Sequence, residues 1–170
     1  TALILFTFSI LHSGYTNAQT KSKFGHIDSQ ELLEAMPEKV EADQKLEAFA
    51  MQLEKQLQAM TTEYESKVRD YRSNEAVMSD IIAQTKAEEI QNLEQRIQSF
   101  QQNAQQSLQK KEGEVYQLVL DKARAAIEEV SKANGYTYVF DSSSGALLYQ
   151  PEGDDVLALV KKQLGIADAP

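Results

Sequence analysis

Residues that could do chemistry are few in this sequence, and their spacing does not favour catalysis. The chain contains two histidines and no cysteine. His12 lies in an apolar stretch near the beginning, so His26 is the only histidine outside it. Structural zinc sites use about four Cys or His ligands, and a site of that kind is therefore excluded. We interpret His26, in the short stretch "FGHID", as a packing or interface residue rather than a catalyst.

The remaining polar clusters have structural explanations. Asp154 and Asp155 stand before an apolar segment, where negative charge favours a helix N-terminus. The serines at 142–144 lie in a polar break before Gly145, with no base nearby in the sequence. There is no phosphate-binding loop and no glycine-rich dinucleotide motif. We therefore expect no enzyme, no catalytic residue, no metal and no cofactor.

Composition indicates a helical protein. The length of 170 residues is typical of one domain. Gln, Glu, Lys, Ala and Leu are abundant, and Gly and Pro number only seven and three, which is typical of long helices. The formal net charge of −9 argues against nucleic acid as a partner, because phosphate binding requires clustered Lys and Arg. It also argues against electrostatic docking on an anionic membrane.

The first eighteen residues differ from the rest of the sequence. An apolar run from Ala2 to Leu11 is followed by small and polar residues. The run is too short to span a bilayer, which takes about 20 residues. It fits a secretory signal peptide over 1–18, with Thr16 and Ala18 before a cut ahead of Gln19. The alternative is a buried strand or short helix. No Cys follows the run, so lipid attachment there is excluded, and the exported protein would lack disulfides.

Local signals divide the next segment, 19–37, into a strand and a short helix. The residues 24–28 form the expected strand. Asp28 and Glu31 have the spacing of a capping box, which predicts a helix that begins directly after Asp28. Pro37 suits the first position of the following helix, because its missing N–H costs nothing there.

The segment 38–114 is predicted to be an arm of two antiparallel helices. In its first half, apolar residues recur with an eleven-residue repeat, which is typical of a nearly straight helix. We expect the turn at 78–85, with Thr85 and Glu88 capping a second helix that ends at Asn134 and Gly135. Each helix is about 40 residues long, and hinges are expected near 37–43 and 111–114.

The segment 115–170 contains the end of the second helix, a predicted β-hairpin at 136–150 and a last helix at 154–165. The hairpin and the first strand carry more apolar area than one small sheet can bury, and its edges would be unpaired. Closing a barrel from several copies removes both problems. The alternative is a monomer in which the last helix covers the sheet. The expected assembly residues are Ile27, Tyr136, Tyr138, Phe140, Leu147, Leu148 and Tyr149.

Apolar side chains along the arm are candidates for a binding surface. Methionine adapts to many partners and suits promiscuous contacts. The alternative is that these side chains fill the seam between the two helices. The range 91–109 also holds eight glutamines, whose amides can bond an unfolded backbone weakly. The candidate residues are Met51, Met60, Tyr64, Tyr71, Met78, Ile81 and Phe100.

Four segments together resemble the OmpH/Skp family of periplasmic chaperones. They are "GHIDSQELLEAMPE" at 25–38, "AIEEVSKANGYTYVFD" at 126–141, "ALLYQ" at 146–150 and "DDVLALVKKQLG" at 154–165. The resemblance implies an α+β, mostly helical fold in which a long helical hairpin, a coiled-coil arm, projects from a small β body. It also implies a homotrimer whose body combines strands of three chains, with the arms surrounding a cavity.

The resemblance implies an ATP-independent holdase of the periplasm that keeps unfolded outer-membrane proteins from aggregating. Lipopolysaccharide or membrane contact is not carried over, because the best-known members are basic and this chain is acidic. The competing hypothesis is a structural or adaptor coiled-coil protein of the cell envelope.

Overall fold

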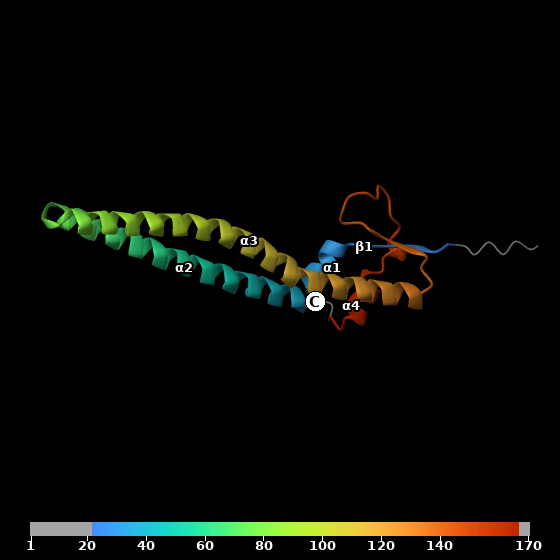
Figure 1. Ribbon diagram of the computed structural model, residues 1–170. Coiled ribbons are helices and arrows are strands. Elements are labelled where there is room, and N and C mark those ends of the chain that lie inside the picture. Colours follow the sequence, from blue (N-terminus) through green and yellow to red (C-terminus); the bar gives the residue numbers. More distant parts are fainter. Residues whose placement is uncertain (1–21, 167–170) are drawn as a thin grey trace, which may run out of the picture.

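The computed structural model describes residues 22–166, and the predicted signal peptide at 1–18 lies outside this range. A long pair of antiparallel helices extends from a small body that holds the strands and the short helices (Figure 1). The α+β, mostly helical fold with a projecting helical hairpin is therefore confirmed. Its elements are β1 (Phe24–Ile27), α1 (Ser29–Ala35), α2 (Pro37–Asn74), η1 (Glu75–Val77), α3 (Asp80–Ala133), β2 (Tyr138–Asp141), η2 (Glu152–Asp154) and α4 (Leu157–Gln163).

The helix ends predicted from capping chemistry are confirmed on the body side. The Asp28 carboxylate accepts a hydrogen bond of 2.9 Å from the backbone N–H of Glu31 at the start of α1. Pro37 occupies the first turn of α2. After the C-cap Asn134 of α3, Gly135 adopts a left-handed φ of 70°, which an L side chain would resist.

The turn at the arm tip comes earlier than the expected 78–85. It comprises η1 and the two residues before Asp80. The Ser79 hydroxyl accepts the N–H of Ile82 and caps α3, whereas the Thr85 hydroxyl donates to the Ile81 carbonyl inside the helix. Because the helix begins at Asp80, α3 is 54 residues long, compared with 38 for α2.

The β-hairpin expected at 136–150 is wrong for the single chain. β2 pairs in parallel with β1, in a register that places Phe24 opposite Tyr138 and Ile27 opposite Asp141. The residues 142–150 form a loop, and Leu148 in it is 99% exposed. The apolar run at 146–149 is typical of a buried strand, but within the described chain these residues pair with no strand.

The last helix is shorter than the expected 154–165. The N-cap of α4 is Val156, and the Asp155 carboxylate just before it accepts the N–H of Leu157 at 2.8 Å, whereas Asp154 lies in η2. Just before the helix, the N–H of Val156 donates to the His26 carbonyl at 2.9 Å. The chain before α4 thus lies along β1, on the edge not used by β2.

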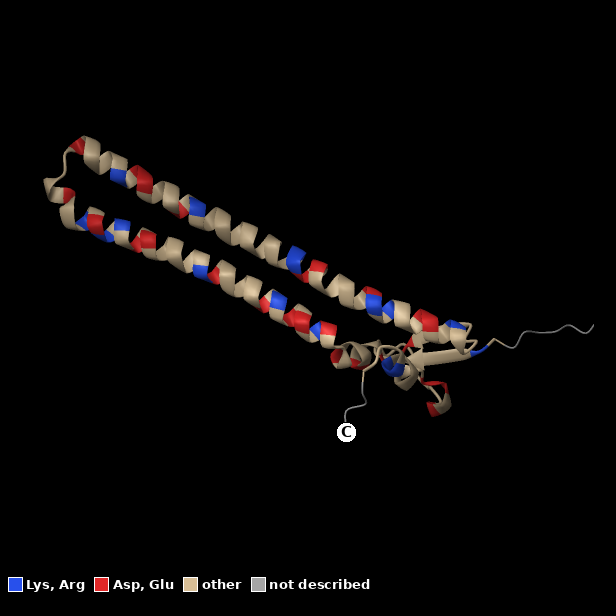
Figure 2. Ribbon diagram, turned by 90° about the horizontal axis from the view of Figure 1, so that it is seen from below, with Lys and Arg blue, Asp and Glu red and all other residues tan. Residues whose placement is uncertain are grey.

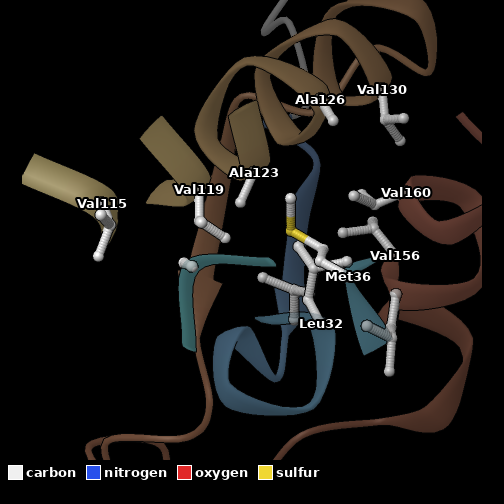
Figure 3. Packing of buried hydrophobic residues seen from close by; sticks show 12 residues of the cluster. Leu32, Met36, Val115, Val119, Ala123, Ala126, Val130, Val156 and Val160 are labelled. Carbon is white, nitrogen blue, oxygen red and sulfur yellow. The ribbon is translucent and has the colours of Figure 1, made fainter. Parts of the chain in front are cut away.

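One hydrophobic core holds the body together (Figure 3). Four of its side chains are completely buried: Leu32, Met36, Val156 and Val160. The buried residues of α3, from Val115 to Val130, belong to the same cluster. Ile27 is 2% exposed and belongs to this core. Ile27 therefore belongs to the body, as predicted for it, in the core of its own chain.

Gly25 is expected to be the least replaceable glycine of the body. A Cβ there would lie 2.9 Å from the Tyr136 ring and 3.2 Å from the Asp154 carbonyl. Gly25→Ala should lower the free energy of unfolding by about 1–3 kcal/mol, measured by chemical denaturation. Gly113→Ala is the control, because its Cβ meets nothing within 4 Å and should stabilise α3 by up to ~1 kcal/mol. Equal effects of both changes would contradict this packing.

Candidate functional site

The arm does not bury its own apolar stripe. Ala42 and Val115 are buried at the root, the end of the arm that joins the body. Further along the arm, Leu93 is the only buried residue. Leu53 and Leu57, two apolar residues of α2, are only half-buried. The two helices therefore hold each other without a continuous dry core, and apolar surface stays accessible along their length.

The structure distributes the seven candidate binding residues over the whole arm. Met51 and Ile81 are 59% and 79% exposed. The other five are half-buried: Met60, Tyr64, Tyr71, Met78 and Phe100. Met60 and Phe100 are brought together, since both line a hollow of about 600 Å³ between α2 and α3. The candidates thus form a long apolar surface with one concave place rather than a single pocket.

Charged residues of both signs alternate along both helices, with an uncharged stretch in the middle of α3 (Figure 2). That stretch runs over 97–109, between Arg96 and Lys110, and contains Gln, Asn, Ser and apolar residues. Neither helix carries a cluster of Lys and Arg of the kind that binds phosphate groups.

Two ion pairs link the helices near the tip. Lys67 Nζ lies 3.0 Å from Glu89 Oε2, and Lys86 Nζ lies 2.5 Å from Asp70 Oδ2. The hydrogen bond from Lys86 lowers the pKa of Asp70, and the bond from Lys67 lowers the pKa of Glu89. Exposed pairs contribute little to stability, so their main effect is to set the register of α3 against α2.

A second set of polar contacts links the helices at the root. The Tyr116 hydroxyl donates a 2.5 Å hydrogen bond to Asp43 Oδ1, and Lys39 Nζ lies 2.8 Å from Asp43 Oδ2. Lys122 also pairs with Glu38. The hinge expected near 37–43 is therefore tied to α3. The hinge expected near 111–114 falls inside the continuous helix α3.

The Asp43 contacts should make the root sensitive to acid. The hydrogen bond from Lys39, followed by that from Tyr116, lowers the pKa of Asp43. A carboxylate with a lowered folded pKa stabilises the fold above its unfolded pKa, about 3.9, and loses this effect as pH falls through the folded pKa. Asp43→Asn should therefore lower the melting temperature at about pH 7, and the gap to wild type should close toward about pH 3.

Glu41→Gln is the matched control for this change, because Glu41 pairs only along its own helix, 3.7 Å from Lys45 Nζ. It should leave the melting temperature nearly unchanged at each pH. A gap between wild type and Asp43→Asn that stays constant from about pH 7 to about pH 3 would contradict the role of the Asp43 charge.

The body presents an exposed aromatic face. The rings of Phe24, Tyr138 and Phe140 stack side by side, with centroid distances of 5.9 to 6.3 Å. All three are exposed, at 50%, 59% and 45%. Tyr138 and Phe140 share one face of β2 because they are two residues apart, and the parallel register brings Phe24 beside Tyr138.

The other predicted assembly residues differ in exposure. Leu148 and Tyr149 are 99% and 83% exposed in the loop after β2, and Leu147 is half-buried there. Tyr136 packs against the body core, with Lys23 Nζ 3.9 Å above its ring centroid. Phe24 was not among the predicted residues. Its aromatic side chain in the first strand was the available signal, but only the parallel pairing shows that it joins this face.

The residues considered for catalysis have structural partners. His26 is 6% exposed, and its Nε2 lies 3.0 Å from the Pro151 carbonyl. Ser29 and Ser143 donate hydroxyl hydrogen bonds of 2.7 Å to Asp141. Burial raises the pKa of Asp141, but the hydrogen bonds from these serines outweigh it and the pKa is lowered. These bonds join the end of β2 to the start of α1.

Residues 22–166 offer neither a cluster of metal-ligating side chains nor a membrane-spanning helix. No group of three or more His, Cys, Asp or Glu side chains is placed to hold a metal ion. None of the helices in this range combines the length and apolar character needed to cross a bilayer.

A family model described as "Outer membrane protein (OmpH-like)" matches residues 23–164, from just before β1 to the residue after α4. This range includes the whole arm and the body. The chain belongs to the OmpH-like family. Sequence similarity links this family member to "Chaperone protein Skp" of Vibrio cholerae, with 22% identity over 142 residues, or 84% of this chain and 82% of that protein.

A solved OmpH-like structure has the same fold. It is that of a putative outer membrane chaperone of Caulobacter crescentus, with a TM-score of 0.75 at 15% identity, and the match covers 84% of this chain and 83% of the other. Both relatives are named as chaperones, so the OmpH-like family is one of chaperones rather than of known enzymes.

Proposed function

We propose that this protein is an ATP-independent holdase chaperone that binds unfolded outer-membrane proteins and prevents their aggregation. The observation that carries the proposal is the arm, in which two long helices pair yet leave most of their apolar side chains only partly buried from root to tip, and Met51 and Ile81 exposed. A helical pair of a purely structural protein would bury this stripe, since burial provides most of its stability.

The distribution of the exposed side chains suits an unfolded client. Met51, Met60 and Met78 occupy successive parts of the arm, and flexible thioethers adapt to different side chains. The contacts are individually weak and far apart, so a client is held loosely at many points. Folding of the client into the membrane would then compete with the arm and release it without a nucleotide.

A homotrimer would give these weak contacts their combined strength. The stacked rings of Phe24, Tyr138 and Phe140 and the exposed Leu148 and Tyr149 support assembly through the body. Within residues 22–166, β2 has a strand neighbour on one edge only, so its other edge is available to a further copy. Three arms around one cavity raise the effective concentration of binding surface for a single client.

The periplasm is the proposed compartment. The apolar start of the chain fits a signal peptide that is removed after Ala18. The absence of cysteine means that oxidation in this compartment introduces no disulfide. Lipopolysaccharide is not proposed as a ligand, because the chain has a net charge of −9 and its lysines and arginines are dispersed.

The test is the aggregation of an outer-membrane β-barrel protein diluted out of urea, followed by light scattering. The purified chain should suppress scattering at about one trimer per client, equally with and without ATP. It should bind the unfolded client and not the same protein folded in detergent. Unchanged scattering at excess chain would refute the proposal, and binding of one folded partner only would favour the adaptor hypothesis.

A further inference from the structure

The middle of the arm differs from its two ends. The root is tied by Asp43 and Tyr116, and the tip by Lys67 and Glu89. Between these contacts, over about 36 Å of α2, the described side chains of α2 and α3 make no hydrogen bond or ion pair with each other. The hollow of about 600 Å³ lies in this middle segment.

The lining of the hollow combines apolar and amide groups from both helices. Met60 and Phe100 supply the apolar surface, and Arg96 is the only charged residue of the lining. Side-chain amides offer two N–H donors and an acceptor oxygen each. These amide side chains are Gln56, Asn92, Gln95 and Asn103.

We propose that this hollow binds one extended, uncharged polypeptide segment that carries a large apolar or aromatic side chain. This inference rests on the proposed function and assigns one site within it, between the two helices of a single arm. The volume is large enough for aromatic side chains, since binding pockets of about 300–1,000 Å³ hold drug-sized ligands. The client side chain would contact Met60 and Phe100, and the amides would bond its backbone N–H and C=O groups.

The charge of the lining selects the segment. A basic client residue would lie near Arg96 and would find no carboxylate in the lining, so the hollow disfavours Lys and Arg in the bound segment. Membrane-facing strands of outer-membrane barrels alternate apolar with polar residues and avoid charge on the lipid face. Such strands, before they fold, are the proposed occupants. Because no ion pair is involved, binding should be insensitive to salt.

The absence of cysteine allows a direct test at the site. Ser99→Cys, which lies in the lining, would carry a solvent-sensitive dye, and Ser107→Cys on the same helix outside the lining is the control. The probe is a synthetic ten-residue peptide of alternating Thr and Phe, compared with a peptide in which two Thr are Lys. The uncharged peptide should shift the emission at position 99 and not at 107, and should bind about tenfold tighter than the charged one.

A pair of charge-matched variants tests the lining. Gln95→Glu with Asn103→Asp should weaken the uncharged peptide about tenfold, whereas Gln44→Glu with Gln52→Glu, on the exposed surface of α2, should not. Affinity should be equal at about 0.05 M and about 0.5 M NaCl. Helix content by circular dichroism shows that each variant is folded.

Equal dye responses at 99 and 107, or equal affinities of both variants, would overturn the inference. The aggregation assay separates this outcome from failure of the proposed function. If the chain suppresses aggregation but the peptide does not bind at the hollow, only the proposed binding site in the hollow is refuted. Loss of suppression in the unmodified chain refutes the holdase function itself.

Discussion

Met36→Ala is expected to lower the free energy of unfolding by about 2–5 kcal/mol. The Met36 side chain is completely buried between α1, α3 and α4, where it contacts the cluster that contains Leu32, Ala123 and Val160 (Figure 3). Met36 also joins α1 to α2, because it is the C-cap of the first helix and the N-cap of the second. A cavity here would loosen both the body and the arm attached to it.

Two substitutions control for this effect. Met36→Leu keeps the volume of the side chain and should cost less than about 1.5 kcal/mol. Met51→Ala removes the same atoms from a residue that is 59% exposed, and its effect should stay within about 0.5 kcal/mol. Denaturant unfolding at one fixed chain concentration measures all three, because assembly would make stability depend on concentration. Similar costs for Met36→Ala and Met51→Ala would contradict the core described above.

Phe140→Asp is expected to dissociate the assembly. The ring is exposed in the single chain and stacks beside both Phe24 and Tyr138, on the face proposed to meet other copies. Transfer of an unpaired carboxylate into such an interface is unfavourable by several kcal/mol, and ~3 kcal/mol already weakens association about a hundredfold. Sedimentation should show the wild-type chain as a trimer and the variant as a monomer at micromolar concentration.

Val77→Asp is the matched control for assembly. Val77 is 82% exposed in η1 at the arm tip, far from the body, so the same kind of change there should leave the trimer intact. Circular dichroism separates dissociation from unfolding, since a monomeric Phe140→Asp chain should retain the helix content of its arm. A variant that stays trimeric would show that the aromatic face is not the assembly interface.

Local chemistry explains which elements could be predicted from the sequence. Asp28, Pro37 and Gly135 act on backbone groups within a few residues of themselves, so their capping roles follow without knowledge of the tertiary structure. The apolar repeat of α2 is likewise a local property, and the long helix it predicts is observed from Pro37 to Asn74.

The position of the turn depended on contacts that the sequence pattern does not show. Ser79 and Thr85 are both able to cap a helix, and no Gly or Pro marks the turn. The pairs Lys67–Glu89 and Lys86–Asp70 hold the first turns of α3 against α2. Helix α3 begins at Asp80 because the Ser79 hydroxyl, and not that of Thr85, accepts a backbone N–H as its cap.

Strand pairing was the least predictable part of the body. The residues 136–141 alternate as a strand does, and a turn and a second apolar segment follow them, which is the pattern of a hairpin. Alternation, however, only indicates one buried face and does not identify the neighbouring strand. In the structure β2 pairs with β1 in parallel, from over a hundred residues away, as in the contact of Ser29 with Asp141. In this arrangement Ile27 is buried and Phe24 is exposed, although both are apolar residues of the same strand.

Within the candidate site, the apolar residues of the arm were predictable but their grouping was not. Helical spacing placed Met60, Tyr64 and Phe100 on the arm, and the structure keeps all three half-buried. That Met60 and Phe100 meet in one hollow depends on the register between α2 and α3. This register is set by the polar contacts at root and tip, which join residues distant in the sequence.

Native mass spectrometry of the chain mixed with a urea-unfolded outer-membrane β-barrel protein tests the central claim most directly. The mass of the complex reports both the number of chains and the number of clients. Three chains with one client is the predicted composition, and it should disappear when the client is folded beforehand. Client-free monomers, or a complex with a single chain, would contradict the account of three arms around one unfolded protein.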